Sequence, residues 1–162
     1  MVGIQEVSIA VASASVTVAA IYYVWQIRHQ TKTRQTDLVM RLYSTYCSKE
    51  FIEALTRYLS ADFKSYDDFV EKYGPIPSEN PVQIAFQMVA TFFEGIGELL
   101  HKKLIDVEIV EDLFAVELYW TKAEPLMKEL RKQFSPKLWE WFEYLYNEIK
   151  KRDQHPTASQ TR

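Results

Sequence analysis

The stretch that decides the fold is VQIAFQMVATFFEGIGELL, residues 82–100. Its apolar residues recur in alternating steps of four and three, the spacing that places side chains on one face of an α-helix. Asn80 and Pro81 directly precede it and suit the N-cap and the first helical position. We therefore predict that this segment is the central core helix. Its core-facing residues are expected to be Val82, Phe86, Val89, Phe93, Ile96 and Leu100, flanked by Ala85, Met88, Phe92 and Leu99.

The chain after this segment predicts two further helices. Helical apolar spacing begins after Asp106 and continues to Phe134 across Pro125, so we expect one long helix kinked about one turn before the proline. Two helices broken at Pro125 are the alternative. Ser135 and Pro136 then predict the N-cap and first residue of a last helix. Its inward side chains are expected to be Leu138, Phe142, Leu145 and Ile149.

The chain before the central segment predicts shorter helices. Ser48 suits the N-cap of a helix whose apolar side chains include Ile52, and a further apolar cluster at residues 66–73 precedes the turn-forming GPIPSENP at 74–81. No segment combines strand periodicity with hairpin residues. We therefore predict an all-α fold, with a bundle of about four main helices over residues 38–150 and a flexible polar tail over residues 151–162.

A second apolar stretch, VSIAVASASVTVAAIYYVWQI, occupies residues 7–27 and contains no charged residue. At about 1.5 Å per residue it is long enough to cross a hydrocarbon core of about 30 Å. Its hydroxyl side chains, such as Thr17, can bond back to carbonyls of the preceding turn, so they do not exclude a span. The alternative, a cleaved signal peptide, needs a basic segment that residues 1–6 lack. We predict an uncleaved transmembrane helix over residues 7–27, preceded by a short outer tail over residues 1–6.

The distribution of charge predicts the orientation of this span. Glu6 is the one charged residue before it, whereas Arg28, Lys32, Arg34 and Arg41 follow it. Because cationic residues are retained on the cytoplasmic side, the N-terminus is expected outside the cell membrane and the C-terminal domain in the cytoplasm. The inner membrane interface is expected to comprise aromatic and cationic side chains, namely Tyr22, Tyr23, Trp25, Arg28, Lys32 and Arg34.

Residues 28–37 form a basic neck between the span and the bundle. No proline or glycine occurs between Gln26 and Cys47, so we expect the helix of the span to continue through the neck into the domain. The neck cations are positioned to pair with anionic lipid head groups, and they also satisfy the topology rule.

Composition excludes several classes of function. The formal net charge of -3 argues against a general nucleic-acid-binding domain, which usually carries a basic excess. Cys47 is the single cysteine, so the chain has no internal disulfide framework and suits a reducing compartment. Without a partner histidine, Cys47 is not expected to act as a nucleophile.

Residues 94–101 contain the strongest suggestion of chemistry. Glu98 and His101 form a Glu-x-x-His pair, which is half of a carboxylate di-iron pattern, but the chain contains no second pair. We therefore interpret Glu94, Glu98 and His101, together with Gln83 and Gln87, as a polar face opposite the apolar stripe, and we expect Glu94→Ala to be nearly neutral. No metal, cofactor or catalytic residue is predicted.

Gly95 and Gly97 lie within the same predicted helix, where glycine costs about 1 kcal/mol relative to alanine. A phosphate-binding loop is excluded because no strand precedes them and no Lys-Ser or Lys-Thr follows. We expect both glycines to permit close packing against an aromatic neighbour. A hinge or a ligand groove is the alternative.

Two sets of residues are candidates for association. Small residues at four-residue spacing in the span include Ala10 and Ala14, and such residues permit close packing between membrane helices. Trp139, Trp141 and Tyr144 flank the inward side of the last helix and are candidates for a partner surface.

The arrangement of the chain resembles an uncharacterised family, a domain of unknown function found in small single-pass proteins of bacteria and archaea. The resemblance covers about residues 10–146. It rests on the small-residue-rich span ending in aromatics, the neck WQIRHQTKTRQ, the segment FFEGIGELLHKKLID, a tryptophan about fourteen residues further on, and WEWFEYL near the end. It implies the same plan of anchor and helical bundle, and it assigns no activity.

The sequence therefore favours a membrane-tethered interaction module, a scaffold or accessory subunit without catalytic activity of its own. Its expected partners are membrane lipid and either a second copy or a larger membrane complex, with no nucleic acid and no small-molecule substrate. The alternative is a signalling or stress-response protein that couples the span to the cytoplasmic bundle.

Overall fold

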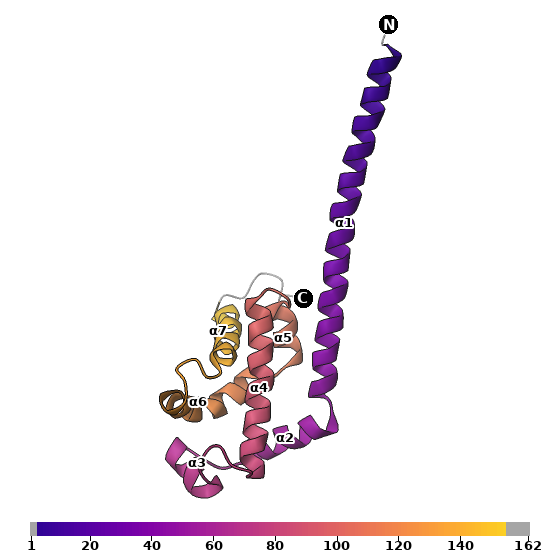
Figure 1. Cartoon of the computed structure of the whole chain (residues 1–162). Helices are drawn as coiled ribbons and strands as arrows, with labels where there is room; N and C mark the ends of the chain where they lie inside the picture. Colours follow the sequence, from indigo (N-terminus) through magenta and orange to yellow (C-terminus); the bar gives the residue numbers. More distant parts are fainter. Residues whose placement is uncertain (1–2, 155–162) are drawn as a thin grey trace. The chain divides into compact units, whose positions relative to one another are not determined.

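The computed structural model describes residues 3–154, with side chains described for Gly3 and from Ser13 onward. Within these residues every regular element is a helix (Figure 1), so the all-α prediction is confirmed. The helices are α1 (Ile4–Tyr46), α2 (Lys49–Ser60), α3 (Tyr66–Tyr73), α4 (Pro81–His101), α5 (Val107–Leu113), α6 (Val116–Gln133) and α7 (Glu140–Gln154).

The chain forms two compact units, residues 1–40 and residues 41–162. The first unit is a single helical stretch, because α1 continues through the neck without a break, as the sequence predicted. Its hydroxyl groups bond back along the helix as expected: Thr17 Oγ1 donates to the carbonyl of Ser13 at 2.9 Å, and Thr31 Oγ1 to that of Ile27 at 2.9 Å.

No helix within the described residues is long and apolar enough to cross a membrane. The predicted span begins with residues 7–12, whose side chains lie outside the described ones. The large apolar side chains that follow on α1 are exposed: Val16, Val18, Ile21, Tyr22, Tyr23, Val24, Trp25 and Ile27.

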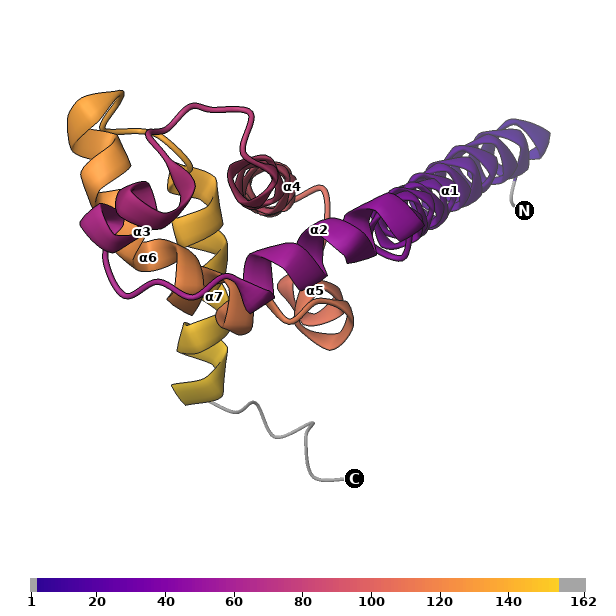
Figure 2. The same ribbon diagram turned by 90° about the horizontal axis from the view of Figure 1, so that it is seen from below.

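Helix α4 is the centre of the second unit, as predicted. It packs most extensively against α7 and α2, and Figure 2 shows it end-on. The side chain of Asn80 caps the helix by accepting from the backbone N–H of Val82 at 2.9 Å. The predicted core face is buried at Phe86, Val89, Phe93, Ile96 and Leu100.

Met88 was expected beside this core face, and that expectation is wrong. Its side chain is 41% exposed, whereas Phe86 is 1% exposed. The reason is helical geometry, since two residues advance the direction of a side chain by about 200° and so carry Met88 to the far side of α4.

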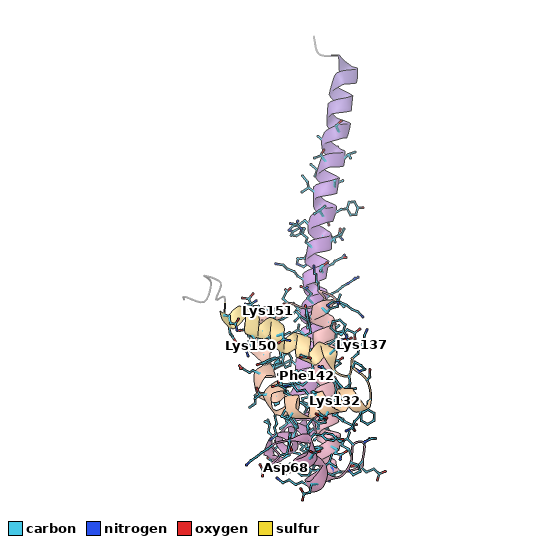
Figure 3. All side chains as sticks on the ribbon, turned by 90° about the vertical axis from the view of Figure 1, so that its left-hand side faces the viewer. Asp68, Lys132, Lys137, Phe142, Lys150 and Lys151 are labelled. Carbon is cyan, nitrogen blue, oxygen red and sulfur yellow. The ribbon has the colours of Figure 1, made fainter. Side chains whose placement is uncertain are left out.

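Stacked aromatic rings fill the space between α4, α6 and α7. The ring of Phe93 lies 5.1 Å from that of Phe142 and 5.2 Å from that of Tyr119, in nearly parallel arrangements. Phe93 and Phe142 are both 0% exposed, and Phe142 is labelled on α7 in Figure 3. These contacts join three helices at a single side chain.

The long helix predicted between Asp106 and Phe134 is wrong, because the chain breaks between α5 and α6. Phe114 has extended backbone angles, φ -129° and ψ 130°. Its ring lies 5.0 Å from that of Tyr46 and 5.9 Å from that of Phe92, so tertiary packing of this ring accompanies the break. Pro125 lies inside α6, so the alternative of two helices broken at Pro125 is also wrong.

The last helix begins at Glu140, four residues later than Pro136. Residues 136–139 form turns instead, and Trp139 has φ 51°. Arg131 stabilises these turns: its Nε donates to the carbonyl of Leu138 at 2.8 Å and its Nη2 to that of Trp139 at 3.0 Å. These bonds span seven and eight residues, and no predicted motif signals them.

The far end of α7 also differs from the prediction. Phe142, Leu145 and Ile149 are buried as expected. The helix continues to Gln154, so residues 151–154 are helical and not part of a tail. The remainder of the predicted tail, residues 155–162, lies outside the described residues.

The short helices begin at serine caps. Ser48 Oγ accepts from the N–H of Phe51 at 3.2 Å, as predicted, and Ser65 Oγ accepts from that of Asp68 at 3.2 Å. Ile52, one of the apolar residues predicted on this helix, lies on α2, and its side chain is 50% exposed. It points away because Phe51, one residue earlier, faces the core.

Gln83 was assigned to the polar face of the central helix, and this is also wrong because its side chain is 0% exposed. Its Nε2 lies within hydrogen-bonding distance of the carbonyls of Tyr73 (3.1 Å), Gly74 (2.6 Å) and Pro75 (3.0 Å). A buried carbonyl without a donor is costly, so this amide stabilises the connection between α3 and α4.

We predict that Phe93→Ala lowers the free energy of unfolding of the full chain by about 3 to 5 kcal/mol, because it removes a fully buried aromatic ring. Leu118→Ala is the control, since Leu118 is 53% exposed and a surface change should stay within about 0.5 kcal/mol. Urea denaturation of both variants checks this. Equal losses would contradict the assignment of Phe93 to the centre of the core.

We predict that Gln83→Ala lowers the free energy of unfolding by about 1 to 3 kcal/mol, because it leaves part-buried carbonyls at the end of α3 without their donor. Gln87→Ala, on the same helix and only half-buried, should change the unfolding free energy by less than about 0.5 kcal/mol. The same denaturation series measures both, and a Gln83→Ala variant as stable as the Gln87 control would refute the anchoring role.

Candidate functional site

The junction of α4 and α7 brings together most of the residues that the sequence analysis singled out. Glu94, Gly97 and His101 lie on successive turns of α4, and Trp141 and Tyr144 lie on the first turns of α7. These two helices share the most extensive packing of the second unit. The α4–α7 junction is therefore the candidate functional site.

Glu94 holds the start of α7. Its Oε2 accepts from the backbone N–H of Phe142 at 2.8 Å, a bond across 48 residues of sequence. Burial raises the pKa of this carboxyl, while bonds from the N–H groups of Phe142 and Trp141 act to lower it. A carboxylate at a helix N-terminus satisfies donors that the helix itself leaves unpaired. The expectation that Glu94 can be removed without effect is therefore not supported by its position.

Gly97 permits the two helices to approach. A Cβ atom at Gly97 would overlap the backbone carbonyl of Trp141 and lie 3.0 Å from its Cβ, so only glycine fits. The prediction of close packing against an aromatic residue is confirmed here. It is wrong for Gly95, where a Cβ would have no atom within 4 Å.

Three aromatic rings meet above this contact. The ring centroid of His101 lies 4.3 Å from that of Trp141, and it meets Tyr144 at 5.5 Å and 88°. Trp141 and Tyr144 are half-buried, and His101 is exposed. The cluster is an amphipathic surface of the kind found at protein contacts.

Trp139 is not part of that surface. Its ring packs edge-on against Phe86, with the centroids 5.3 Å apart, toward the other end of α4. The three aromatic residues proposed as one association face therefore divide, with Trp141 and Tyr144 together and Trp139 apart.

The suggestion of a metal site has no support in this geometry. Glu94 binds the α7 backbone, Glu98 pairs with Lys102 at 2.6 Å, and His101 packs on Trp141. Their side chains thus take separate partners. Within the described residues, no group of three histidine, cysteine, aspartate or glutamate side chains is placed to hold a metal ion. Cys47 is an exposed free thiol.

The candidate residues of α1 lie on an exposed helix. Ala14 is one of several residues along one shallow hollow on its surface, and the side chain of Ala10 lies outside the described ones. The ring of Trp25 packs on that of His29 at 5.8 Å, and Arg28, Lys32 and Arg34 are exposed. The residues lining the hollow are Ala14, Ser15, Val18, Ala19, Tyr22, Tyr23 and Gln26.

Two residues that no predicted motif includes, Lys122 and Tyr46, hold the second unit together. Lys122 Nζ donates to the carbonyls of Leu59 (2.7 Å) and Ala61 (2.6 Å), which satisfies acceptors at the end of α2. Tyr46 at the end of α1 meets Tyr119, with 2.9 Å between the two hydroxyl oxygens. These bonds join residues more than sixty positions apart, so no local motif signals them.

We predict that Glu94→Gln changes the pH dependence of stability. Because burial raises the pKa of Glu94 above its unfolded value, the folded chain binds the proton more tightly, and this contribution is lost as pH rises through the folded pKa. Glutamine keeps an acceptor but does not titrate. The stability of wild type relative to the variant should therefore fall as the pH rises above about 4, the ordinary range of a glutamate carboxyl. Urea denaturation across that range measures it, and parallel curves would contradict the assignment.

Comparison with known proteins identifies a family for nearly the whole chain. A model described as a domain of unknown function (DUF4760) matches residues 9–149, from the described part of α1 to near the end of α7. No curated protein and no solved structure matches the chain. The matched range closely follows the extent of the resemblance seen in the sequence. The chain belongs to the DUF4760 family.

Proposed function

We propose that this chain is a membrane-tethered helical interaction module, a scaffold or accessory subunit whose bundle presents surfaces to partner proteins. The observation that carries the proposal is the exposure of apolar side chains around α1. Val16 is 70% exposed, Val18 67% and Val24 53%, and their helical positions point in different directions. A helix that is apolar on all sides requires apolar surroundings.

The charges that follow this stretch support an orientation. Arg28, Lys32 and Arg34 are exposed on the continuous helix just beyond Trp25. Cations and amphipathic rings at one end of a span favour the cytoplasmic interface, and each cation near an anionic surface contributes about 1 kcal/mol of attraction. In this proposal the N-terminus faces outward and the bundle lies in the cytoplasm.

The second unit supports a binding role over catalysis. The polar residues at the α4–α7 junction act as caps and ring contacts, whereas Trp141 and Tyr144 offer part of their aromatic surface to a partner. The small residues along α1, including Ala14 and Ala19, offer a second place for close helix contact.

A signalling role is the second candidate, and the end of α1 favours it. The last turn of this helix inserts Tyr46 among the rings of Phe51, Phe92 and Phe114, at centroid distances of 5.8, 6.1 and 5.0 Å. A rotation of α1 would therefore act directly on the aromatic core. In this role the span would sense or oligomerise, and the bundle would respond.

The topology is tested with the single native cysteine. Cys47 is exposed, so a membrane-impermeant maleimide should leave it unlabelled in intact cells and label it after lysis. Gly3→Cys in a Cys47→Ser chain should show the reverse, with labelling in intact cells. Alkaline extraction should leave both chains in the membrane fraction. Release of the chain by alkali, or labelling of Cys47 in intact cells, would overturn the proposal.

A further inference from the structure

The face of α4 that points away from the core carries no charge along most of its length. Ile84 is 50% exposed and Met88 41%, and Thr91 and Gly95 are exposed on the same side. The positions i, i+4, i+7 and i+11 share one face of a helix. We call these four residues the outer stripe. No charged residue occurs on α4 before Glu94.

A helix that borders solvent ordinarily carries charged residues on its outer face, and the outer stripe lacks them. Gly95 adds a second, independent peculiarity. It weakens the helix, yet no atom within 4 Å of its Cβ position explains its presence. An apolar hollow between α2 and α4 borders the stripe, and Phe51, Met88 and Phe92 contribute to its lining. The stripe thus has the properties of a surface covered by another helix.

We propose that a second copy of this chain covers it, with the two α4 helices packed antiparallel about a two-fold axis. In such a contact, a residue that lies a given number of positions before the two-fold axis faces the residue of the second copy that lies the same number of positions after it. With the axis midway between Met88 and Thr91, Ile84 faces Gly95 of the second copy. Met88 then faces Thr91 of the second copy, so each bulky side chain meets a small residue, twice over by symmetry.

The charges at the two ends of α4 select the antiparallel direction. Glu79 is exposed just before the helix, and Lys102 and Lys103 are exposed just after it. Antiparallel packing brings Glu79 near the lysines of the second copy, whereas parallel packing would bring like charges together. The lysines retain one local partner, since Lys102 pairs with Glu98 at 2.6 Å.

The four residues of the outer stripe are exposed in the second unit, so this face of α4 is open to a partner. Helix α4 is seen end-on in Figure 2, and it packs against α7, α2 and α6. The stripe spans about 16 Å along the helix, at 1.5 Å per residue over three turns. This inference rests on the proposed interaction role of the bundle, for which it names the partner, and it does not depend on the membrane span.

Cysteine cross-linking of the purified full chain tests the register. Two differently tagged chains in a Cys47→Ser background, one with Ile84→Cys and one with Gly95→Cys, are mixed and oxidised. A disulfide needs Cα atoms about 5.5 Å apart, so chains linked between positions 84 and 95 should form. Links between two copies of position 84 should not, because antiparallel packing separates them by about 16 Å along the axis. Dominant 84–84 links, or no links at all, would overturn the proposal.

A steric exchange tests the contact itself. Gly95→Leu should weaken dimerisation at least tenfold, measured by sedimentation, while circular dichroism shows an intact fold because the site is open in the monomer. Combining Ile84→Ala with Gly95→Leu places the small side chain at position 84 and the large one at position 95. The double variant should therefore dimerise again. Ile84→Asp should abolish it, whereas Ile52→Asp, at an isoleucine with the same 50% exposure, should not.

The outcomes separate this inference from the proposed membrane tether. A wild-type chain that sediments as a monomer, or a Gly95→Leu variant that dimerises as tightly as wild type, would overturn the α4 contact even if maleimide labelling supports the span. A chain that alkali extracts from membranes but that still forms 84–95 links would leave the contact standing and remove the tether.

Discussion

Helices α4 and α7 meet where the backbone of Trp141 lies directly over Gly97, and the remaining contacts of the bundle follow from that approach. The missing side chain at Gly97 allows the Glu94 carboxylate to reach the N–H of Phe142 at 2.8 Å. The same approach brings the rings of Phe93 and Phe142 to 5.1 Å. One glycine therefore sets the helix cap and the aromatic stack together, because a larger residue would move α7 away from both.

The predictable part of the fold came from features that are local in sequence. The serine caps at Ser48 and the Asn80–Pro81 pair depend on neighbouring residues, and the buried stripe through Phe93 depends on helical periodicity. The family resemblance rested on the order of such segments. These signals identify helices and their inner faces, and they do not show how the helices contact one another.

Two of the errors share a physical cause, which is that contacts made outside the local segment accompany the observed structure. The break at Phe114 accompanies ring contacts with Tyr46 and Phe92, and the delayed start of α7 accompanies two bonds from Arg131. At the candidate site, the close packing expected of both glycines was correct for Gly97 and wrong for Gly95, because the sequence does not show where a neighbouring backbone approaches. The role of Glu94 was missed, because its partner is a backbone N–H that 48 residues of sequence separate from it.

Helix α4 has an inner face and an outer face, and one of its two glycines lies on each. Gly97 lies on the inner face, where the backbone of α7 occupies the space that a side chain would need, so the cost of glycine is offset within one chain. Gly95 lies on the outer face, where one chain offers no such compensation. In the proposed dimer, Ile84 of the second copy fills the space beside Gly95, as the backbone of Trp141 fills the space beside Gly97. The absence of charge on α4 before Glu94 then has one explanation, since the inner face packs against helices of the same chain and the outer face against the second copy.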